Sequence, residues 1–174
     1  LCDQVMALFP TPAPVIRTSI SWPKPDPLRA WFPSNSVLIG RPDKGSPCRL
    51  SVALMGGHNA QNHNHNDVGT YMVVVERTAV LTDIGAEVYT QRTFSGRRYE
   101  SKALNSWGHP VPVIGGHLQR SGRDAEAKVL NTEFTPERDR VSMDIRSAYG
   151  LPEIRKLERS FEYDRTGAGR FAVI

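Results

Sequence analysis

The sequence predicts an all-β protein, an antiparallel β-sandwich that follows a proline-rich connector. Three observations indicate this fold class: short apolar runs separated by turn residues, no long amphipathic helical pattern, and an alternation of apolar and polar residues toward the C-terminal end. Val141, Met143 and Ile145 alternate there with polar neighbours, which is the period of a half-buried strand. Many short strands with frequent turns are typical of two packed antiparallel sheets.

The first 35 residues are dense in proline, with seven prolines between positions 10 and 33. Proline lacks a backbone N–H and has a fixed φ, so this stretch suits neither a regular helix nor an inner strand. We expect residues 1–35 to form an extended connector and residues 36–174 to form the sandwich domain. The chain starts without methionine and ends within an expected strand, so we expect it to be a piece of a larger protein.

Eight runs after the connector are expected to form strands. Thr70–Val75 is apolar on both faces, which suits a central strand, and it forms a hairpin with the next run around the turn Glu76-Arg77-Thr78. Residues 89–116 are polar and lack periodicity, and loops of that length are usually functional or disordered. The expected strands are Ser36–Ile39, Cys48–Leu54, Thr70–Val75, Ala79–Thr82, Lys128–Thr135, Arg140–Tyr149, Ile154–Tyr163 and Arg170–Ile174.

Bulk composition indicates a globular chain with a modest positive charge. The 174 residues are 39% hydrophobic and 23% charged, and the formal net charge is +4. No apolar run reaches the length that spans a bilayer, and the basic residues form no nucleic-acid-binding motif. We therefore expect no membrane span and no nucleic acid partner. An acidic polysaccharide, a membrane surface and simple solvation all remain open for the positive charge. Cys2 and Cys48 fit no metal or redox spacing.

The segment from Gly56 to Gly69, GGHNAQNHNHNDVG, contains three of the five histidines within eight positions. Neutral imidazole is a good zinc ligand and titrates near physiological pH. In an extended strand His63 and His65 would point to the same face, where they could share a metal or divide two tasks. A polar, asparagine-rich loop with solvated histidines is the alternative interpretation.

Two later residues can complete a metal site with His65. Asp83 follows the apolar run AVLT, and a buried carboxylate there needs a partner, either a metal or an arginine or backbone amide. His109 lies in NSWGHPVP, where the prolines would hold the loop rigid. Two histidines and one aspartate leave a fourth position for water or another ligand. Asn66 or Asp67 could supply hydrogen bonds to these ligands.

A second polar cluster accompanies the candidate metal ligands. Arginine forks bind carboxylate or sulfate through two hydrogen bonds, and a phenol can transfer protons when its pKa is shifted. Each residue alone suits an ordinary surface position, and it is their crowding near the histidines that favours a functional role. The cluster consists of Tyr89, Arg92, Arg97, Arg98, Tyr99, Asn105 and Gln119. The substrate-binding residues expected among them are Arg92, Arg97, Arg98, Asn105 and Gln119.

The motifs HNHNDVGTYMVVV, LTDIGAEVYTQRTFSGRRYES, NSWGHPVP and GGHLQ, in this order, resemble the heparinase II/III-type polysaccharide lyases. The resemblance covers roughly residues 30–165. Members of this family combine an N-terminal α/α toroid with a C-terminal antiparallel β-sandwich, and this chain resembles the sandwich. They cleave uronic-acid polysaccharides by β-elimination. The resemblance therefore implies an acidic uronate polysaccharide as substrate, a toroid domain as partner and a periplasmic or secreted location.

The resemblance also implies roles for individual residues. In similar members the first histidine of the HxH motif lies at the active site and the second binds a structural zinc, which makes His63 catalytic and His65 a zinc ligand. Asp83 and His109 match the other two zinc positions. Tyr99 matches a sandwich tyrosine that reaches the substrate in alginate-active members, and it is the second implied catalytic residue.

One departure from the family pattern bears on activity. No segment here corresponds to the toroid, which supplies the main catalytic tyrosine and the asparagine or histidine that neutralises the substrate carboxylate. We therefore expect half of an active site. A non-catalytic, zinc-stabilised carbohydrate-binding module and a cupin-like metalloenzyme remain alternatives. Cupins also use HxH, but their usual glutamate a few residues later is missing between Asn66 and Tyr71.

We predict that the 174-residue chain alone is catalytically silent but binds acidic sugar chains weakly. β-Elimination creates a C4–C5 double bond conjugated to the carboxylate, which absorbs in the near ultraviolet. Incubation with heparan-type and alginate oligomers should give no such absorbance. Binding should weaken with added salt, because exposed charges are screened over a Debye length of about 10 Å at 0.1 M. Robust lyase activity of this chain would show that it contains a complete site.

Overall fold

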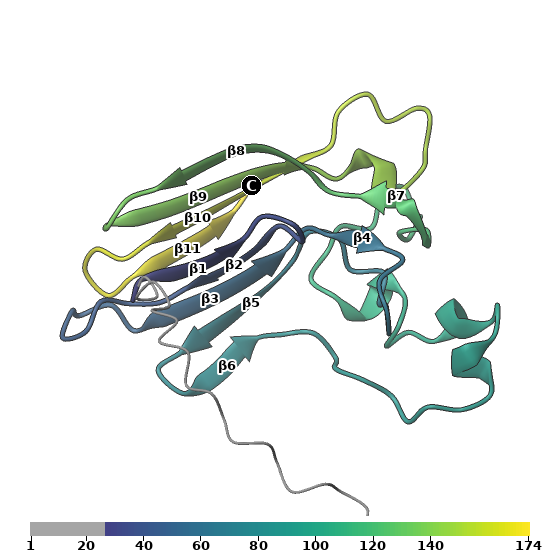
Figure 1. Ribbon diagram of the computed structural model, residues 1–174, viewed down its shortest axis with the longest axis horizontal. Helices are drawn as coiled ribbons and strands as arrows, with labels where there is room; N and C mark the ends of the chain where they lie inside the picture. Colours follow the sequence, from purple (N-terminus) through teal and green to yellow (C-terminus); the bar gives the residue numbers. More distant parts are fainter. Residues whose placement is uncertain (1–26) are drawn as a thin grey trace, which may run out of the picture.

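The computed structural model describes residues 27–174 and contains two antiparallel sheets that pack face to face (Figure 1). The first sheet has the strand order β1 (Arg29–Phe32), β2 (Val37–Gly40), β3 (Leu50–Met55), β5 (Thr70–Val75) and β6 (Thr78–Leu81). The second has the order β11 (Arg170–Val173), β10 (Glu158–Asp164), β9 (Arg138–Asp144) and β8 (Lys128–Phe134). A ribbon of β4 (His58–Asn59) and β7 (Gly122–Glu126) lies at one end. The predicted all-β class and antiparallel sandwich are confirmed.

Strand positions agree with the sequence expectations, with differences at several boundaries. β5 has the expected bounds and lies between β3 and β6, inside the first sheet. Its hairpin to β6 is tighter than expected, because only Glu76 and Arg77 connect the strands, and Glu76 has a φ of 56°. Positive φ is typical of two-residue hairpin turns. The run Arg140–Tyr149 is strand only to Asp144 and then forms the 3₁₀ turn η4 (Arg146–Ala148), while Ile154–Tyr163 is strand only from Glu158.

The connector expected over residues 1–35 differs from the structure in its last part. Residues 29–32 form β1, which pairs with β2 along its whole length. Trp31 packs against the hydrophobic core, and its ring centroid lies 5.7 Å from that of Phe134. Pro33 follows the strand directly, where its missing N–H removes no ladder hydrogen bond. Residues 1–26, which hold the rest of the expected connector, lie outside the described residues.

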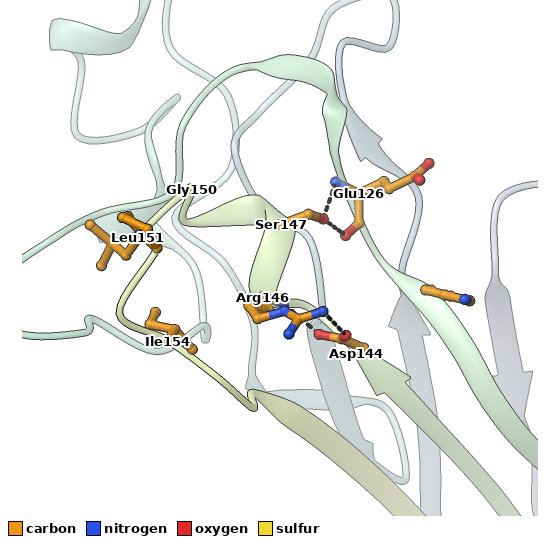
Figure 2. Close-up of a pocket in the computed structure, with 9 residues that line it drawn as sticks. Glu126, Asp144, Arg146, Ser147, Gly150, Leu151 and Ile154 are labelled. Atoms are coloured by element: carbon orange, nitrogen blue, oxygen red, sulfur yellow. Dashed lines mark hydrogen bonds and ion pairs between the residues drawn. The ribbon is translucent and has the colours of Figure 1, made fainter.

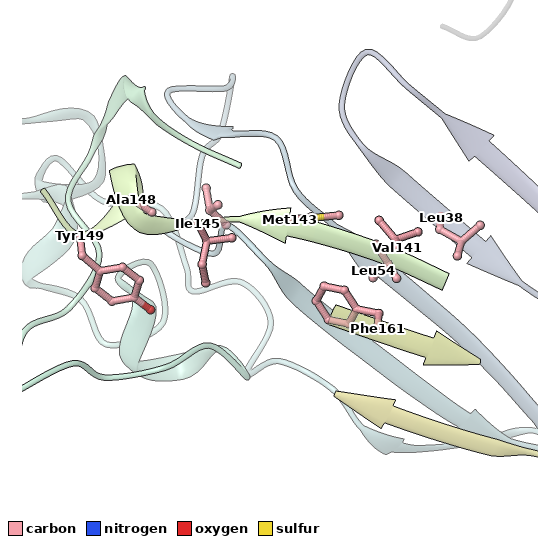
Figure 3. Close-up of a cluster of buried hydrophobic side chains, with 9 residues drawn as sticks. Leu38, Leu54, Val141, Met143, Ile145, Ala148, Tyr149 and Phe161 are labelled. Carbon is pink, nitrogen blue, oxygen red and sulfur yellow. The ribbon is translucent and has the colours of Figure 1, made fainter. Parts of the chain in front are cut away.

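Inward side chains of both sheets pack together in a hydrophobic core cluster (Figure 3). Leu38 and Leu54 come from the first sheet, and Val141, Met143 and Phe161 come from the second; none is more than 2% exposed. Burying a side chain of this size stabilises the fold by roughly 1.5–3 kcal/mol. The alternation predicted from Val141 onward is therefore confirmed, since its apolar members face the opposite sheet.

The long polar loop predicted from residue 89 is also present. Between β6 and β7 the chain leaves the sheets and makes three short 3₁₀ turns before it returns beside β4 (Figure 1). These turns are η1 (Arg92–Phe94), η2 (Arg98–Glu100) and η3 (Ser106–Gly108). Across residues 27–174, no helix has the length and apolar character needed to cross a membrane.

A buried charge network joins the two sheets. Asp139 on β9 accepts a hydrogen bond from Arg29 Nε on β1 at 2.8 Å and another from Arg165 Nη2. Arg165 also donates to the backbone carbonyls of Leu28 at 3.0 Å and Arg41 at 2.7 Å. Asp139 and Arg165 are only 1% and 5% exposed, so each charge depends on the other for compensation.

We predict that Asp139→Ala lowers the free energy of unfolding by about 3–5 kcal/mol, because Arg165 would keep a buried charge without its carboxylate. Urea unfolding followed by tryptophan fluorescence measures this change. Asp124→Ala is the control, since its carboxylate is 76% exposed and pairs with Arg120 at the surface. Exposed pairs contribute about 0–1 kcal/mol. Similar destabilisation by both variants would contradict the proposed importance of the buried network.

Candidate metal centre and the adjoining hollow

The structure brings His65, Asp83 and His109 together from three separate segments. His65 lies in the loop after β4, Asp83 lies just beyond β6, and His109 directly follows η3. The ring centroids of His65 and His109 are 5.2 Å apart in an edge-to-face arrangement. His109 Nδ1 lies 3.6 Å from Asp83 Oδ2. The three residues that the sequence placed in one metal site are therefore neighbours.

Gly108 allows the segment after Asp83 to approach His109 closely. The backbone N–H of Ile84 donates to the Gly108 carbonyl at 3.1 Å. A Cβ at position 108 would lie 2.5 Å from the Ile84 side chain and 2.6 Å from the Lys102 carbonyl oxygen. A glycine is required here, because any side chain would push the two segments apart.

The hydrogen bonds of His109 determine which of its ring nitrogens carries the proton. Its side chain is fully buried, and Nε2 lies 3.2 Å from the carbonyl oxygen of Ala103, to which it must donate. Nδ1 therefore has a free lone pair, and it has no hydrogen-bond partner. This lone pair faces a carboxylate oxygen of Asp83, and either a proton or a metal cation between the two atoms would make the contact favourable. A histidine that binds a metal commonly donates its other N–H to a carbonyl in this way.

The protonation states around this cluster suit a cation. Burial lowers the pKa of His65, and burial together with the nearby His65 lowers the pKa of His109. Both imidazoles are therefore neutral at pH 7, which is the form that binds metals. Burial and the neighbouring Asp83 raise the pKa of Asp67 to about 7. A bound cation would offset the repulsion between these two carboxylates.

The distances test whether zinc fits these residues. Within residues 27–174, no group of three or more His, Cys, Asp or Glu side chains is placed so that it could hold a metal ion directly. Two ligand atoms on a tetrahedral zinc are about 3.3 Å apart. The 3.6 Å between His109 Nδ1 and Asp83 Oδ2 is close to this value. With the buried lone pair of His109, the donor types of this cluster fit zinc.

His63 does not have the strand geometry expected from the sequence. It lies in a turn with a φ of 57°, so His63 and His65 are not successive same-face residues of a strand. The His63 ring stacks on Tyr89 with centroids 5.9 Å apart, and its Nδ1 lies 3.3 Å from the Tyr89 hydroxyl. Both histidines nevertheless line one polar hollow of about 180 Å³. His58, Asn62 and Asp67 line it too, and we name it the histidine hollow.

Arg98 is engaged by the protein itself. Its guanidinium donates twice to the carbonyl oxygen of Asn64, at 3.0 and 2.8 Å, and once to that of Thr93 at 3.0 Å. It also lies 6.0 Å from the ring centroid of Tyr89 and 5.9 Å from that of Tyr99. Arg98 therefore holds the loop that follows β4 against the loop that precedes η2, and its donors do not point to a ligand.

Arg92 and Arg97, which the sequence also placed at the substrate, each pair with a glutamate. Arg92 Nη2 donates to both carboxylate oxygens of Glu87 at 2.9 Å. Hydrogen bonds from Ser101 and Arg92 lower the pKa of Glu87. Arg97 forms a two-pronged pair with Glu100 on the exposed surface. The positive charge of both arginines is already compensated.

Tyr99 and Asn105 belong to a chain of polar contacts beside the histidine hollow. Asn64 Nδ2 donates to the Tyr99 hydroxyl at 3.0 Å and to Asn66 Oδ1 at 3.2 Å. The hydroxyl proton of Tyr99 therefore stays available for donation. Asn105 accepts from the Trp107 N–H at 2.8 Å and donates to the Tyr99 carbonyl at 3.2 Å, so it orders η3. Asn66 makes no hydrogen bond to a candidate metal ligand among the described residues.

Gln119 is the centre of a buried amide network that sequence reasoning missed. It is 4% exposed, and it accepts from Asn59 Nδ2 at 3.1 Å and from the Val68 N–H at 2.9 Å. Its Nε2 donates to the Val68 carbonyl at 2.8 Å. Asn59 is itself 1% exposed and donates to the Arg120 carbonyl. Gln119 therefore holds the backbone at Val68 in place. The asparagines around the HxH motif are the sequence feature that could have indicated this amide network.

A larger hollow, of about 470 Å³, lies elsewhere, beside η4 (Figure 2). Several of its polar groups contact other protein groups. Arg146 lies 3.3 Å from Asp144 and donates to the Arg155 carbonyl at 2.8 Å, while Ser147 donates to the Glu126 carbonyl at 2.7 Å. No residue predicted for the site lines it.

No protein-family model matches the chain, and no curated protein matches it. The likeness to heparinase II/III-type lyases therefore rests on the ordered sequence motifs.

Proposed function

We propose that this chain is the sandwich domain of a polysaccharide lyase that cleaves uronic-acid polysaccharide by β-elimination and binds zinc through His65, Asp83 and His109. One observation supports this best: the two histidines of the HxH motif have separate environments. His65 belongs to the half-buried group with Asp83 and His109. His63 is exposed, lines the histidine hollow and contacts a phenol. This division matches a structural metal beside a group that acts on substrate.

Zinc, when bound, would supply a cross-link between three loops that few strand contacts hold together. His109 Nδ1 and Asp83 Oδ2 are the ligand atoms that already face each other. His65 supplies the second imidazole. These three protein ligands leave the fourth position of a tetrahedral zinc for water or another ligand. The structural role of the zinc is what the family resemblance implies.

The reaction requires a base for the C5 proton and an acid for the leaving oxygen. As the base removes the proton, the electrons of the C5–H bond form the C4–C5 double bond and the C4–O bond breaks. If His63 Nδ1–H donates to the Tyr89 oxygen, its Nε2 lone pair is the proton acceptor. Tyr99, whose oxygen accepts from Asn64, keeps its hydroxyl proton for the leaving sugar oxygen. By family resemblance, the toroid domain supplies the main catalytic tyrosine and the group that neutralises the substrate carboxylate, so His63 and Tyr99 are only this chain's part of the site.

The cupin-like alternative is less consistent with this geometry. A shared metal would need both imidazoles of the HxH motif in one cluster. His63 instead lies in a turn and stacks on Tyr89. A zinc-stabilised binding module has the same metal site and differs in having no proton transfer, so a test of His63 separates it from the lyase.

We predict about one zinc per chain, by elemental analysis, in protein purified without added metal. His65→Ala should release the zinc and lower the melting temperature, because metal binding contributes to the free energy of folding. His117→Ala is the matched control, since this exposed histidine lies in a separate tight turn and should leave zinc content unchanged. Full zinc retention after replacement of His65, Asp83 and His109 together would eliminate the metal assignment.

We predict that His63→Ala, in the lyase with its toroid domain, keeps its zinc and its fold but loses turnover on the order of 10²–10⁴-fold, the range typical of general acid–base groups. The near-ultraviolet absorbance of the unsaturated product measures this loss. Tyr89→Phe keeps the stacked ring and removes the hydroxyl, so a smaller loss is expected. Zinc loss in His63→Ala would contradict the separate roles of the two histidines, and near-normal turnover would favour the binding module.

A further inference from the structure

Arg123 is a cation at the edge of the histidine hollow whose charge is not compensated. It lies on β7, which pairs with β4, and its Nη1 lies 3.3 Å from Nε2 of His58. His58 lines the hollow together with His63 and His65. In the part of the chain that the structure describes, Arg123 makes no ion pair. It therefore differs from the three arginines expected at the substrate, which glutamates or backbone carbonyls already engage.

Neither acidic residue of β7, Asp124 or Glu126, forms an ion pair with Arg123 in the part of the chain that the structure describes. Asp124 pairs with Arg120 at 2.8 Å, and this contact lowers the pKa of its carboxyl. The acid next to Arg123 in the sequence is therefore already paired with another arginine.

The contact between Arg123 and His58 joins two hydrogen-bond donors. His58 Nδ1 accepts from the Ala60 N–H at 3.2 Å, so a neutral His58 carries its proton on Nε2. This N–H faces the guanidinium of Arg123, which has only donors. Two donors that face each other are satisfied when an anion accepts from both. The pair has the composition of an anion-binding site that opens onto the histidine hollow.

We infer that Arg123 and His58 bind an anionic group of the acidic sugar chain, either a uronate carboxylate or a sulfate ester. This inference rests on the proposed function, since it names the anion contact of the same hollow. An arginine fork binds either group through two parallel hydrogen bonds, and the His58 Nε2–H adds a third donor. A sugar held there lies next to His63, which lines the same hollow. Arg123 is then a specificity residue that selects acidic over neutral sugars.

Calorimetric titration of the 174-residue chain tests this inference. The ligands are an alginate tetramer, which carries only carboxylates, a heparan-type tetrasaccharide, which also carries sulfates, and a neutral cellotetraose. Arg123→Gln should raise the Kd for acidic ligands about tenfold, equivalent to about 1.4 kcal/mol. His58→Phe should weaken acidic binding likewise. Neither variant should change the Kd for the neutral ligand. A loss with both acidic ligands assigns the carboxylate, and a loss confined to the heparan-type ligand assigns the sulfate.

Arg49→Gln is the matched control, because it removes the same charge from an exposed arginine that pairs with Glu76. It should change the Kd by no more than about twofold, as expected for an exposed charge pair. Equal weakening by Arg49→Gln and Arg123→Gln, or no weakening by Arg123→Gln while the unmodified chain binds acidic ligands, overturns the inference and leaves the proposed function standing. An unmodified chain that binds acidic and neutral ligands equally would instead overturn the proposed function, and the inference with it.

Discussion

The candidate site depends on buried amide side chains that satisfy the backbone of an irregular region. Between β6 and β7 there is almost no strand ladder, yet every buried N–H and C=O group still requires a partner. Gln119 binds both backbone groups of Val68, and Arg98 binds carbonyls of two different loops. These contacts fix the loops that carry His65 and Tyr99. The position of the site is therefore determined by directional hydrogen bonds, while the sandwich beside it is held by apolar burial.

This difference explains why the fold was more predictable than the site. Alternation of apolar and polar residues depends only on the period of a strand, and it identified β9, although with other bounds. A continuous apolar run identified β5. β1 was missed because Pro33 made its surroundings resemble a connector. Its stability comes from distant partners, the core around Trp31 and the carboxylate of Asp139, which bonds to Arg29. Contacts between residues more than 100 positions apart override local propensity, and a single sequence does not reveal them.

The sequence could predict which residues form the candidate site, but it could not predict which of their side chains pair with other protein groups. The motif order indicated that His65, Asp83 and His109 belong together, and the structure places them side by side. The sequence does not show which cations are already compensated, because a net charge of +4 counts all arginines equally. Glu87 lies five residues before its partner Arg92, and no pattern distinguishes that pair from a free arginine. Only the side-chain geometry shows which arginines already pair with the protein and which can still bind a ligand.

The left-handed conformation of His63 connects the local backbone to the proposed chemistry. A non-glycine residue with positive φ costs about 1–2 kcal/mol, and such residues persist where the surroundings hold them. Here the turn is closed by Asn64, whose N–H donates to the Gln61 carbonyl and whose side-chain oxygen accepts from the Gln61 N–H, each at 3.2 Å. A regular strand would have given His63 and His65 one shared face and one shared environment. The turn instead leaves His65 half-buried beside His109, with a lowered pKa, and leaves His63 exposed and stacked on Tyr89, so two identical side chains two residues apart become chemically distinct.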